Sequence, residues 1–240
     1  MKQFTLPTIF ILLAVIIPLA GCSSFSPVTG SGNVITQKMD YGGFTSVDVS
    51  TGFKVDITQS DSYSIIITAD DSLFESLKVI QQNDTLKIYL DPIYSHAVSI
   101  KKAKITMPVL EALTLSSGAK GSISGFESQN DFTLNMSLGS GLTGSMKAEK
   151  VKMNLASSTT ATLQGSANII ILEASAVSHA NLDDFTVNEA DIKLSSGSVA
   201  TVTVMGDLDA DLSSGSRLYY LGSPVIGDVT ITGGSTMKSK

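Results

Sequence analysis

The feature that most constrains this chain is a short pattern that recurs about every 19 residues from Leu113 onward. Each copy alternates apolar and polar residues, passes a corner of small residues, and continues into a second apolar position. The apolar residues that precede the corners form an anchor series: Leu115, Met136, Leu155, Ala174, Leu194, Leu212 and Ile231. A repeat of this length indicates a solenoid, and alternation with a period of two indicates that strands build it.

The repeat predicts an all-β fold, a right-handed parallel β-helix (β-solenoid) with coils of about 19 residues. Such a coil has room for three short strands, and stacked coils pair strand on strand at about 4.8 Å. In this register Leu194 faces inward and contacts Ala174 and Leu212 on the neighbouring coils. The first residues of the corners are expected to form a hydroxyl ladder along one edge: Ser116, Ser137, Ala156, Ser175, Ser195, Ser213 and Thr232.

The predicted domain covers residues 33–240, with regular coils in 111–240 and a less regular part in 33–110. Two interpretations of the less regular part remain open. An apolar column through Val47, Ile66, Leu86 and Ile105 favours a continued solenoid with looser corners. The turn signal Asn83-Asp84 between two strand-like segments favours a separate β-sheet cap. A single helical turn is expected near residues 70–77, with Asp71 or Ser72 as its N-cap.

The N-terminal residues are typical of a bacterial lipoprotein precursor. Lys2 precedes an apolar stretch at residues 10–17 that is too short to span a bilayer, so residues 1–21 are predicted to be a signal peptide. Residues 19–22, Leu-Ala-Gly-Cys, resemble the lipobox, in which the cysteine is acylated and the peptide is cut just before it. We therefore predict lipidation at Cys22, followed by a flexible tether at residues 22–32.

This anchor predicts a membrane-anchored lipoprotein of the cell envelope. Ser23, directly after the cysteine, favours the outer membrane if the cell is Gram-negative. In a Gram-positive or archaeal cell the same anchor would face outward. Because Cys22 is the single cysteine, lipidation leaves no thiol for a disulfide, a nucleophile or a metal site.

The charge of the chain excludes one class of partner. Only 16% of the residues are charged and the formal net charge is −6, so phosphate-driven binding to nucleic acid is not expected. The predicted partners are the membrane, through the N-terminal lipid, and an unknown extracellular or envelope protein or polysaccharide. No cofactor is predicted, and the oligomeric state is open.

Two sets of charged residues fall at constant offsets from the anchors. Asp191, Asp209 and Asp228 are predicted neighbours on adjacent coils, where carboxylates repel, pair with lysines or hold a hard cation. They form a weak candidate cation patch, and a solvated acidic face is the favoured interpretation. One position before the anchors, the residues Glu173, Lys193 and Asp211 predict a ladder of salt bridges.

Two further motifs predict no chemistry. Residues 139–144 match the dinucleotide-binding pattern G-x-G-x-x-G, but they lie at a predicted corner with strand on both sides, which favours a structural role. His96 and His179 are the two histidines, and the repeat does not bring them together, so no metal centre is predicted.

Several segments together carry a family resemblance: residues 32–34, 43–49, 53–59, 69–71, 86–88 and 105–113, followed by the Ser-Ser-Gly coils. Over roughly residues 32–240 the chain resembles the putative auto-transporter adhesin, head GIN domain family. The resemblance implies an exported or lipid-anchored envelope protein with a right-handed β-helical fold and an adhesin-like or surface-interaction role. It implies no catalytic residues.

Three functional hypotheses follow. The first is a non-enzymatic, lipid-anchored β-solenoid that presents a long face to a partner. The second is a polysaccharide lyase or hydrolase on the same scaffold, which the absence of tryptophan disfavours because sugar-binding platforms rely on aromatic rings. The third is a structural envelope protein that self-associates through the ends of its solenoid.

Overall fold

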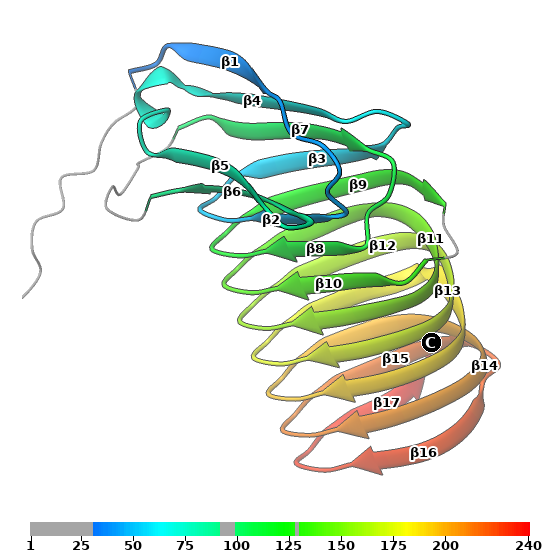
Figure 1. Ribbon diagram of the computed structural model, residues 1–240. Coiled ribbons are helices and arrows are strands. Elements are labelled where there is room, and N and C mark those ends of the chain that lie inside the picture. The colour runs from blue at the N-terminus through cyan, green and yellow to red at the C-terminus, as the bar shows by residue number, and fades with distance from the viewer. Residues whose placement is uncertain (1–30, 92–98, 128–129) are drawn as a thin grey trace, which may run out of the picture.

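The computed structural model describes residues 31–91, 99–127 and 130–240, in which seventeen strands form a solenoid of about seven turns. Figure 1 shows the coils stacked in one direction, from a cap built by the N-terminal strands to the last coil at the C-terminal end. The all-β fold and the parallel coils of about 19 residues that the sequence predicts are confirmed.

Long, curved strands make up the regular coils. Adjacent strands pair in parallel, as in Leu155 with Ala174 and Ala174 with Leu194. The strands of this region are β8 (Ala112–Leu115), β9 (Lys120–Glu127), β10 (Phe132–Met136), β11 (Gly141–Leu155), β12 (Thr160–Ala174), β13 (His179–Leu194), β14 (Val199–Leu212), β15 (Arg217–Gly222), β16 (Val225–Ile231) and β17 (Thr236–Ser239).

In the coils of β11 to β14, the three strands predicted for each coil occur as inward-facing segments of one continuous strand. In β13 the alternation of buried and exposed residues resets twice, giving three buried groups: Ala180 and Leu182, then Phe185 and Val187, then Ala190, Ile192 and Leu194. The pairing register with β14 shifts after Leu182 and after Val187. Local bulges therefore turn the chain without ending the strand.

Glycines stand where these bends bring neighbouring coils together. Gly165 has a φ of +119°, and a Cβ atom there would lie 2.0 Å from the carbonyl oxygen of Met146 on the adjacent coil. A Cβ atom at Gly144 would lie 2.2 Å from the carbonyl oxygen of Ile123. Glycine avoids both collisions because it has no side chain. The structural interpretation of the 139–144 motif is therefore correct.

A tight corner of four residues closes each coil on the opposite edge. Its two central residues have positive φ, as in a type I′ turn; in the corner at 195–198 these are Ser196 and Gly197, at 51° and 74°. The N–H of Ser198 donates to the carbonyl of Ser195 at 3.1 Å, and the N–H of Gly197 donates to Ser214 on the next coil at 2.9 Å. The same cross-coil bond recurs from corner to corner, which locks the coils in register.

The hydroxyl ladder lies at a different corner position from the predicted one. The first corner residues are partly exposed, except Thr232, which is exposed, and the buried hydroxyls belong to the fourth position: Ser140, Thr159, Ser178, Ser198, Ser216 and Ser235. The hydroxyl of Thr159 bonds that of Ser178 at 3.2 Å, and Ser216 Oγ donates to the carbonyl of Leu194 at 3.1 Å. Two left-handed residues reverse the chain, so the fourth side chain is the one that points inward.

The N-terminal part combines one true coil with an antiparallel cap. Strands β2 (Ser46–Val49) and β3 (Lys54–Gln59) stack in parallel on β8 and β9, while β6 (Thr85–Leu90) and β7 (Lys101–Met107) stack in parallel on their other side. Strands β1 (Val34–Met39), β4 (Ser64–Asp70) and β5 (Leu77–Gln82) then add in antiparallel pairs and complete the cap.

The interpretation of residues 33–110 as a continued solenoid is therefore wrong for β1, β4 and β5. The proposed apolar column fails at Ile66, which is partly exposed, whereas Ile65 and Ile67 are fully buried. The alternative cap is correct for these strands, and Asn83, with a φ of 53°, begins the predicted hairpin turn between β5 and β6. Antiparallel pairing closes this end of the interior.

Replacing Leu194 with alanine tests the coil register. Leu194 is 1% exposed and pairs with Ala174 and Leu212, as predicted, so the change should destabilise the fold by roughly 2–5 kcal/mol. Lys193→Ala is the matched control, because the Lys193 side chain is exposed and its ion pair with Asp191 is worth less than about 1 kcal/mol. Urea unfolding measures both, and equal losses would contradict this register.

Candidate functional site

A shallow groove with a volume of about 450 Å³ lies beside the corners. It runs across β8, β10 and the C-terminal halves of β11 to β14, which lie side by side in the front sheet of Figure 1. Each coil contributes one outward polar side chain, and from β10 to β14 each coil also contributes the small first residue of its corner. The small corner residues leave the space beside the polar side chains open.

The parallel register places these polar side chains in a single row, which we call the groove row. Direct pairing joins each member to the next across neighbouring strands: Thr114, Asn135, Asn154, Glu173, Lys193 and Asp211. Adjacent strands are about 4.8 Å apart, so the row offers one hydrogen-bonding group at each step of that length.

The groove row is neutral at one end and charged at the other. Asn154 Nδ2 donates to Asn135 Oδ1 at 2.7 Å, which leaves further donor and acceptor sites of both amides for a ligand. Beyond them follow an acid, a base and an acid: Glu173, Lys193 and Asp211. The row can bind by hydrogen bonds and alternating charges.

The row continues into the cap through Asp48 and Lys87. Asp48 on β2 pairs with Thr114 on one side and with Lys87 of β6 on the other. Partial burial raises the pKa of the Asp48 carboxyl, and the positive charge of Lys87 lowers it in part. The cap therefore extends this row of polar groups beyond the regular coils.

The predicted salt-bridge ladder is wrong in its partners. Glu173, Lys193 and Asp211 do lie in register, but the Lys193 ammonium lies 3.8 Å from Asp191, two residues back in the same strand. Among the described residues, Lys193 forms an ion pair with Asp191 and none with Glu173 or Asp211. Glu173 and Asp211 therefore keep carboxylates that face the groove.

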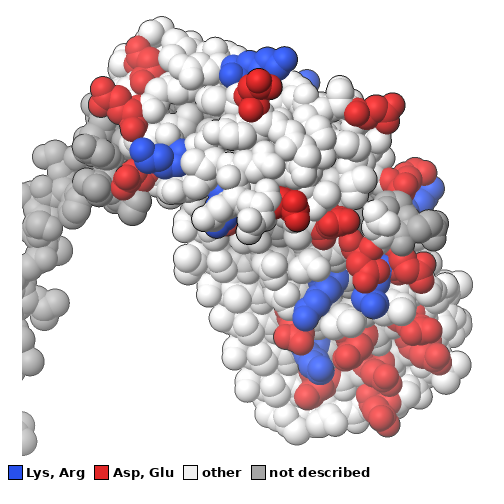
Figure 2. Space-filling model, in the orientation of Figure 1, with Lys and Arg blue, Asp and Glu red and all other residues white. Residues whose placement is uncertain are grey.

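The three aspartates of the candidate cation patch are only partly brought together. Asp191 and Asp209 pair directly on β13 and β14, as predicted. Asp228 instead donates its backbone N–H to Asp209 Oδ1 at 2.7 Å. Among the described residues, no group of three or more histidine, cysteine, aspartate or glutamate side chains has a geometry that could hold a metal ion. Figure 2 shows acidic side chains spread over this part of the surface.

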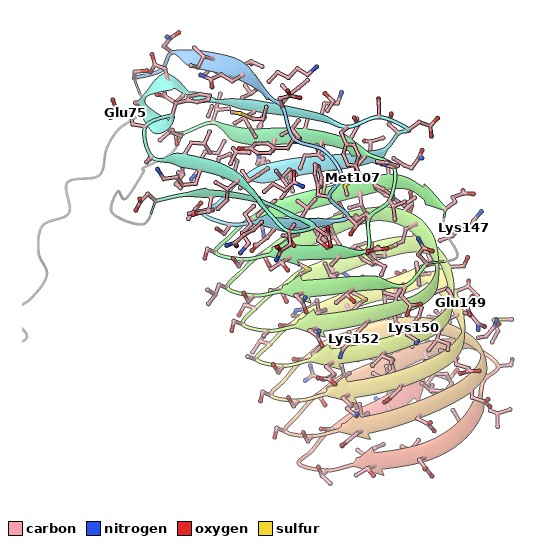
Figure 3. All side chains as sticks on the ribbon, viewed as in Figure 1. Glu75, Met107, Lys147, Glu149, Lys150 and Lys152 are labelled. Carbon is pink, nitrogen blue, oxygen red and sulfur yellow. The ribbon has the colours of Figure 1, made fainter. Side chains whose placement is uncertain are left out.

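A separate charged cluster lies at the bend of β11. Figure 3 shows Lys147, Glu149, Lys150 and Lys152 in this part of the chain. Lys147 pairs with Glu127 at 3.2 Å and Lys150 with Asp131 at 3.7 Å. All these side chains are exposed enough that the pairs add little stability. The cluster is thus a neutralised surface.

Two predicted residues cannot be placed. Cys22 and His96 lie outside the described residues, as do the signal peptide and most of the tether. His179 begins β13, where it pairs with Thr160 and Val199. In the described part of the chain, no helix is long and apolar enough to cross a membrane.

Asp70 forms a hydrogen-bonded clasp on the first described residues. Its carboxylate accepts bonds from the N–H groups of Ser31 and Gly32, at 2.9 and 2.8 Å, and from the Ser72 hydroxyl at 2.7 Å. These donors, the Ser72 hydroxyl foremost, hold the pKa of Asp70 well below its usual value of 3.8. The clasp fixes the start of the described chain to the cap.

The clasp also caps the short 3-10 helix Asp71–Leu73. Asp70, one residue before the predicted candidates, is the N-cap and accepts from the N–H of Ser72. Asp71 instead accepts bonds from the Ser31 hydroxyl and from Asn33 Nδ2, the latter at 2.8 Å. Figure 3 shows Glu75, just after this turn, at the outer end of the cap.

The groove row corresponds to a pattern in the sequence, a polar residue directly before each anchor. The ladder prediction used only the three charged residues of this pattern. The residues one position before the anchors include Thr114, Asn135 and Asn154 as well as the three charged residues. Neutral side chains carry no obvious chemistry singly. Their common offset becomes informative once the corner is known to leave space beside them.

The structure thus defines a β-solenoid capped at one end, with a polar groove along its front sheet and no evident catalytic centre among the described residues. Residues 43–224 match the family described as "Putative auto-transporter adhesin, head GIN domain". The chain belongs to this family, as its sequence resemblance indicated. A search among curated proteins finds no match.

Several solved structures share the fold. A putative adhesin from Bacteroides fragilis is 18% identical, with a TM-score of 0.80 over 89% of this chain and 100% of its own. A putative lipid binding protein from Parabacteroides distasonis is 20% identical, with a TM-score of 0.72 over 90% and 100%. A putative adhesin from the same organism has 18% identity and a TM-score of 0.68 over 90% and 100%. At these identities the likeness shows the fold alone.

Asp70→Asn should loosen the clasp, because an amide replaces the charged acceptor on which the donors converge. Since the pKa of Asp70 is lowered in the folded state, its contribution to stability is present above about pH 4 and is lost as the pH falls further. The melting temperature of the variant should therefore lie below that of the wild type at pH 7, and the difference should shrink below pH 4.

Asp61→Asn is the control for this experiment, because Asp61 is an exposed carboxylate elsewhere in the cap. Its melting temperature should follow the wild type at every pH. A difference between the Asp70 variant and the wild type that grows as the pH falls would contradict the clasp.

Proposed function

We propose that this protein is a lipid-anchored adhesin of the cell envelope that binds an extended polymer along its groove without catalysing a reaction. The observation that carries the proposal is the groove row, which repeats a polar group from coil to coil over a hollow of about 450 Å³. Membership of the adhesin family supports a surface or envelope role.

The shape of the groove favours a long ligand over a compact one. Small-molecule sites are concave and cover most of their ligand, whereas this groove is shallow and crosses many strands. A polysaccharide carries hydroxyl groups along its length, and these can pair with the amides, hydroxyl and charged groups of the row. We therefore favour a polysaccharide, with an extended polypeptide as the alternative partner.

The composition of the groove supports binding without turnover. Glu173 and Asp211 are the carboxylates of the row, and Lys193 stands between them in register. Glycoside hydrolysis needs one carboxylic acid with a raised pKa beside a second carboxylate that flanks the same bond. In the groove row a lysine separates the two carboxylates in register, so they do not flank one bond as a pair, and we assign the row to binding.

Asn154→Arg should weaken polymer binding by at least about tenfold, because a long cationic side chain would fill the middle of the groove. Asn181→Arg is the matched control: Asn181 is an exposed asparagine in the N-terminal half of β13, outside the groove lining. Biolayer interferometry on a panel of neutral and acidic polysaccharides measures affinity, and a reducing-sugar assay measures turnover. Equal affinities for the two variants, or release of products, would contradict the proposal.

The proposed anchor rests on the lipobox-like residues 19–22 and is tested separately. Cys22→Ser should move the protein from the detergent phase to the aqueous phase in Triton X-114 partitioning, because no other cysteine can be acylated. Protease treatment of intact cells then reports whether the wild-type domain is exposed outside the cell. A Cys22→Ser variant that stays in the detergent phase would show that the lipobox interpretation is wrong.

A further inference from the structure

The C-terminal end of the solenoid leaves its interior uncovered. All seven residues of β16 are exposed, although this strand pairs in register with β14. Its inward residues Ile226, Val229 and Ile231 are 45%, 37% and 44% exposed. Their pairing partners on β14 are at most 4% exposed: Leu208, Ala210 and Leu212.

This end contrasts with the capped end of the same molecule. At the cap, antiparallel strands cover the interior, and Phe44, Phe53 and Leu73 are fully buried. Terminal units of a solenoid need a cover of this kind, because stacking otherwise ends on an apolar face. The uncovered strand β16 also presents an edge that can pair with another strand.

The two halves of the open end carry opposite charges. The front half, formed by β14 and β16, holds exposed acidic side chains: Asp207, Asp209, Asp211 and Asp228. The back half, formed by β15, β17 and the residue after it, holds exposed basic side chains: Arg217, Lys238 and Lys240. Figure 2 shows the acidic side chains gathered over the last coils on the face in view.

We propose that this open end docks onto the same end of a second copy of the chain. A twofold contact uses one patch on both partners, so the patch must complement itself. An arrangement that lays β16 over β17 of the second copy sets the acidic half of each molecule on the basic half of the other. Both apolar interiors are then covered, and charges of opposite sign meet on both sides.

Strand alternation is compatible with this contact. Val229 and Ile231 face inward on β16, and Met237 faces inward on β17, where it pairs with buried Leu218. Asp228 precedes Val229 and Lys238 follows Met237, so both charged side chains face outward by strand alternation. In an antiparallel pairing that keeps the apolar residues inside, Asp228 therefore lies on the same outer face as Lys238 of the second copy. Like charges placed opposite each other would instead repel and weaken the contact.

The geometry of the contact gives it an adhesive role, and this step rests on the proposed lipid anchor. Ser31 is held at the cap by Asp70, and Cys22 lies nine positions earlier, a distance of at most about 30 Å along the chain. The anchor therefore belongs to the capped end, and the open end faces away from the membrane. Two molecules that dock through their open ends would join opposing membranes.

Sedimentation velocity of residues 22–240 carrying Cys22→Ser tests the contact in solution. A concentration-dependent dimer is expected. Asp228→Lys should raise its dissociation constant at least about tenfold, because the introduced ammonium group then meets Lys238 of the second copy, and Lys238→Glu should do the same. An equimolar mixture of the two variants should dimerise, since each then offers the charge that the other needs.

Three results would overturn the contact: a monomer at every soluble concentration, a dimer that ignores both charge changes, or a mixture that fails to restore association. Association with a different protein alone, without a dimer, would assign the end to another partner and also overturn it. Circular dichroism should show unchanged folding in both variants, because Asp228 and Lys238 are exposed.

Vesicle aggregation tests the joining of membranes. The same chain, attached through a histidine tag before residue 22 to vesicles of phosphatidylcholine and a nickel-chelating lipid, should raise turbidity. Vesicles bearing Asp228→Lys alone should stay dispersed, and they should aggregate when mixed with vesicles bearing Lys238→Glu. Dimerisation in solution without aggregation would overturn the opposed arrangement. Because the tag replaces the lipid, a failure of the lipidation proposal is read separately from Triton X-114 partitioning.

Discussion

The structure depends on one constraint, the register lock between successive corners. Each corner reverses the chain with two left-handed residues, and its third N–H donates to the second carbonyl of the next corner, as in Gly197 to Ser214. This bond repeats every coil, so one coil cannot slide against the next without breaking it. A slip by one residue would also turn every inward side chain outward. The interior column and the outward rows both follow from this lock.

The groove is a consequence of the same corner geometry. The corner's fourth residue points inward and its first residue is small, which opens a hollow beside the last outward residue of each strand. Because the coils keep register, those outward residues line up from Thr114 to Asp211. A solenoid thereby converts scattered polar residues into a continuous surface, whereas a globular enzyme gathers a few residues into a pocket. This difference favours binding to a polymer.

The two ends of the molecule are unequal for a physical reason. The N-terminal end is closed by antiparallel strands and by the Asp70 clasp, while the last coil ends with the inward residues of β16 exposed. A repeat protein is stabilised by contacts between neighbouring units, so the last unit lacks one neighbour. Opposite charges on the two halves of that unit make a second copy a suitable neighbour. The two proposed binding surfaces meet at Asp211, which belongs both to the groove row and to the acidic half of the last unit.

The sequence by itself determined the fold class, the coil length and the facing of the regular strands, because a period of two within a period of 19 is a local property of the chain. Leu194 against Ala174 and Leu212 follows from counting alone. Only the tertiary structure decided that the buried hydroxyls lie at the fourth corner position, that Lys193 pairs with Asp191, and that β1, β4 and β5 run antiparallel. Those features depend on backbone direction at the corners and on contacts between residues far apart in sequence, such as Ser31 with Asp70. Periodicity specifies which residues face inward, but the side-chain partners depend on the three-dimensional path of the backbone.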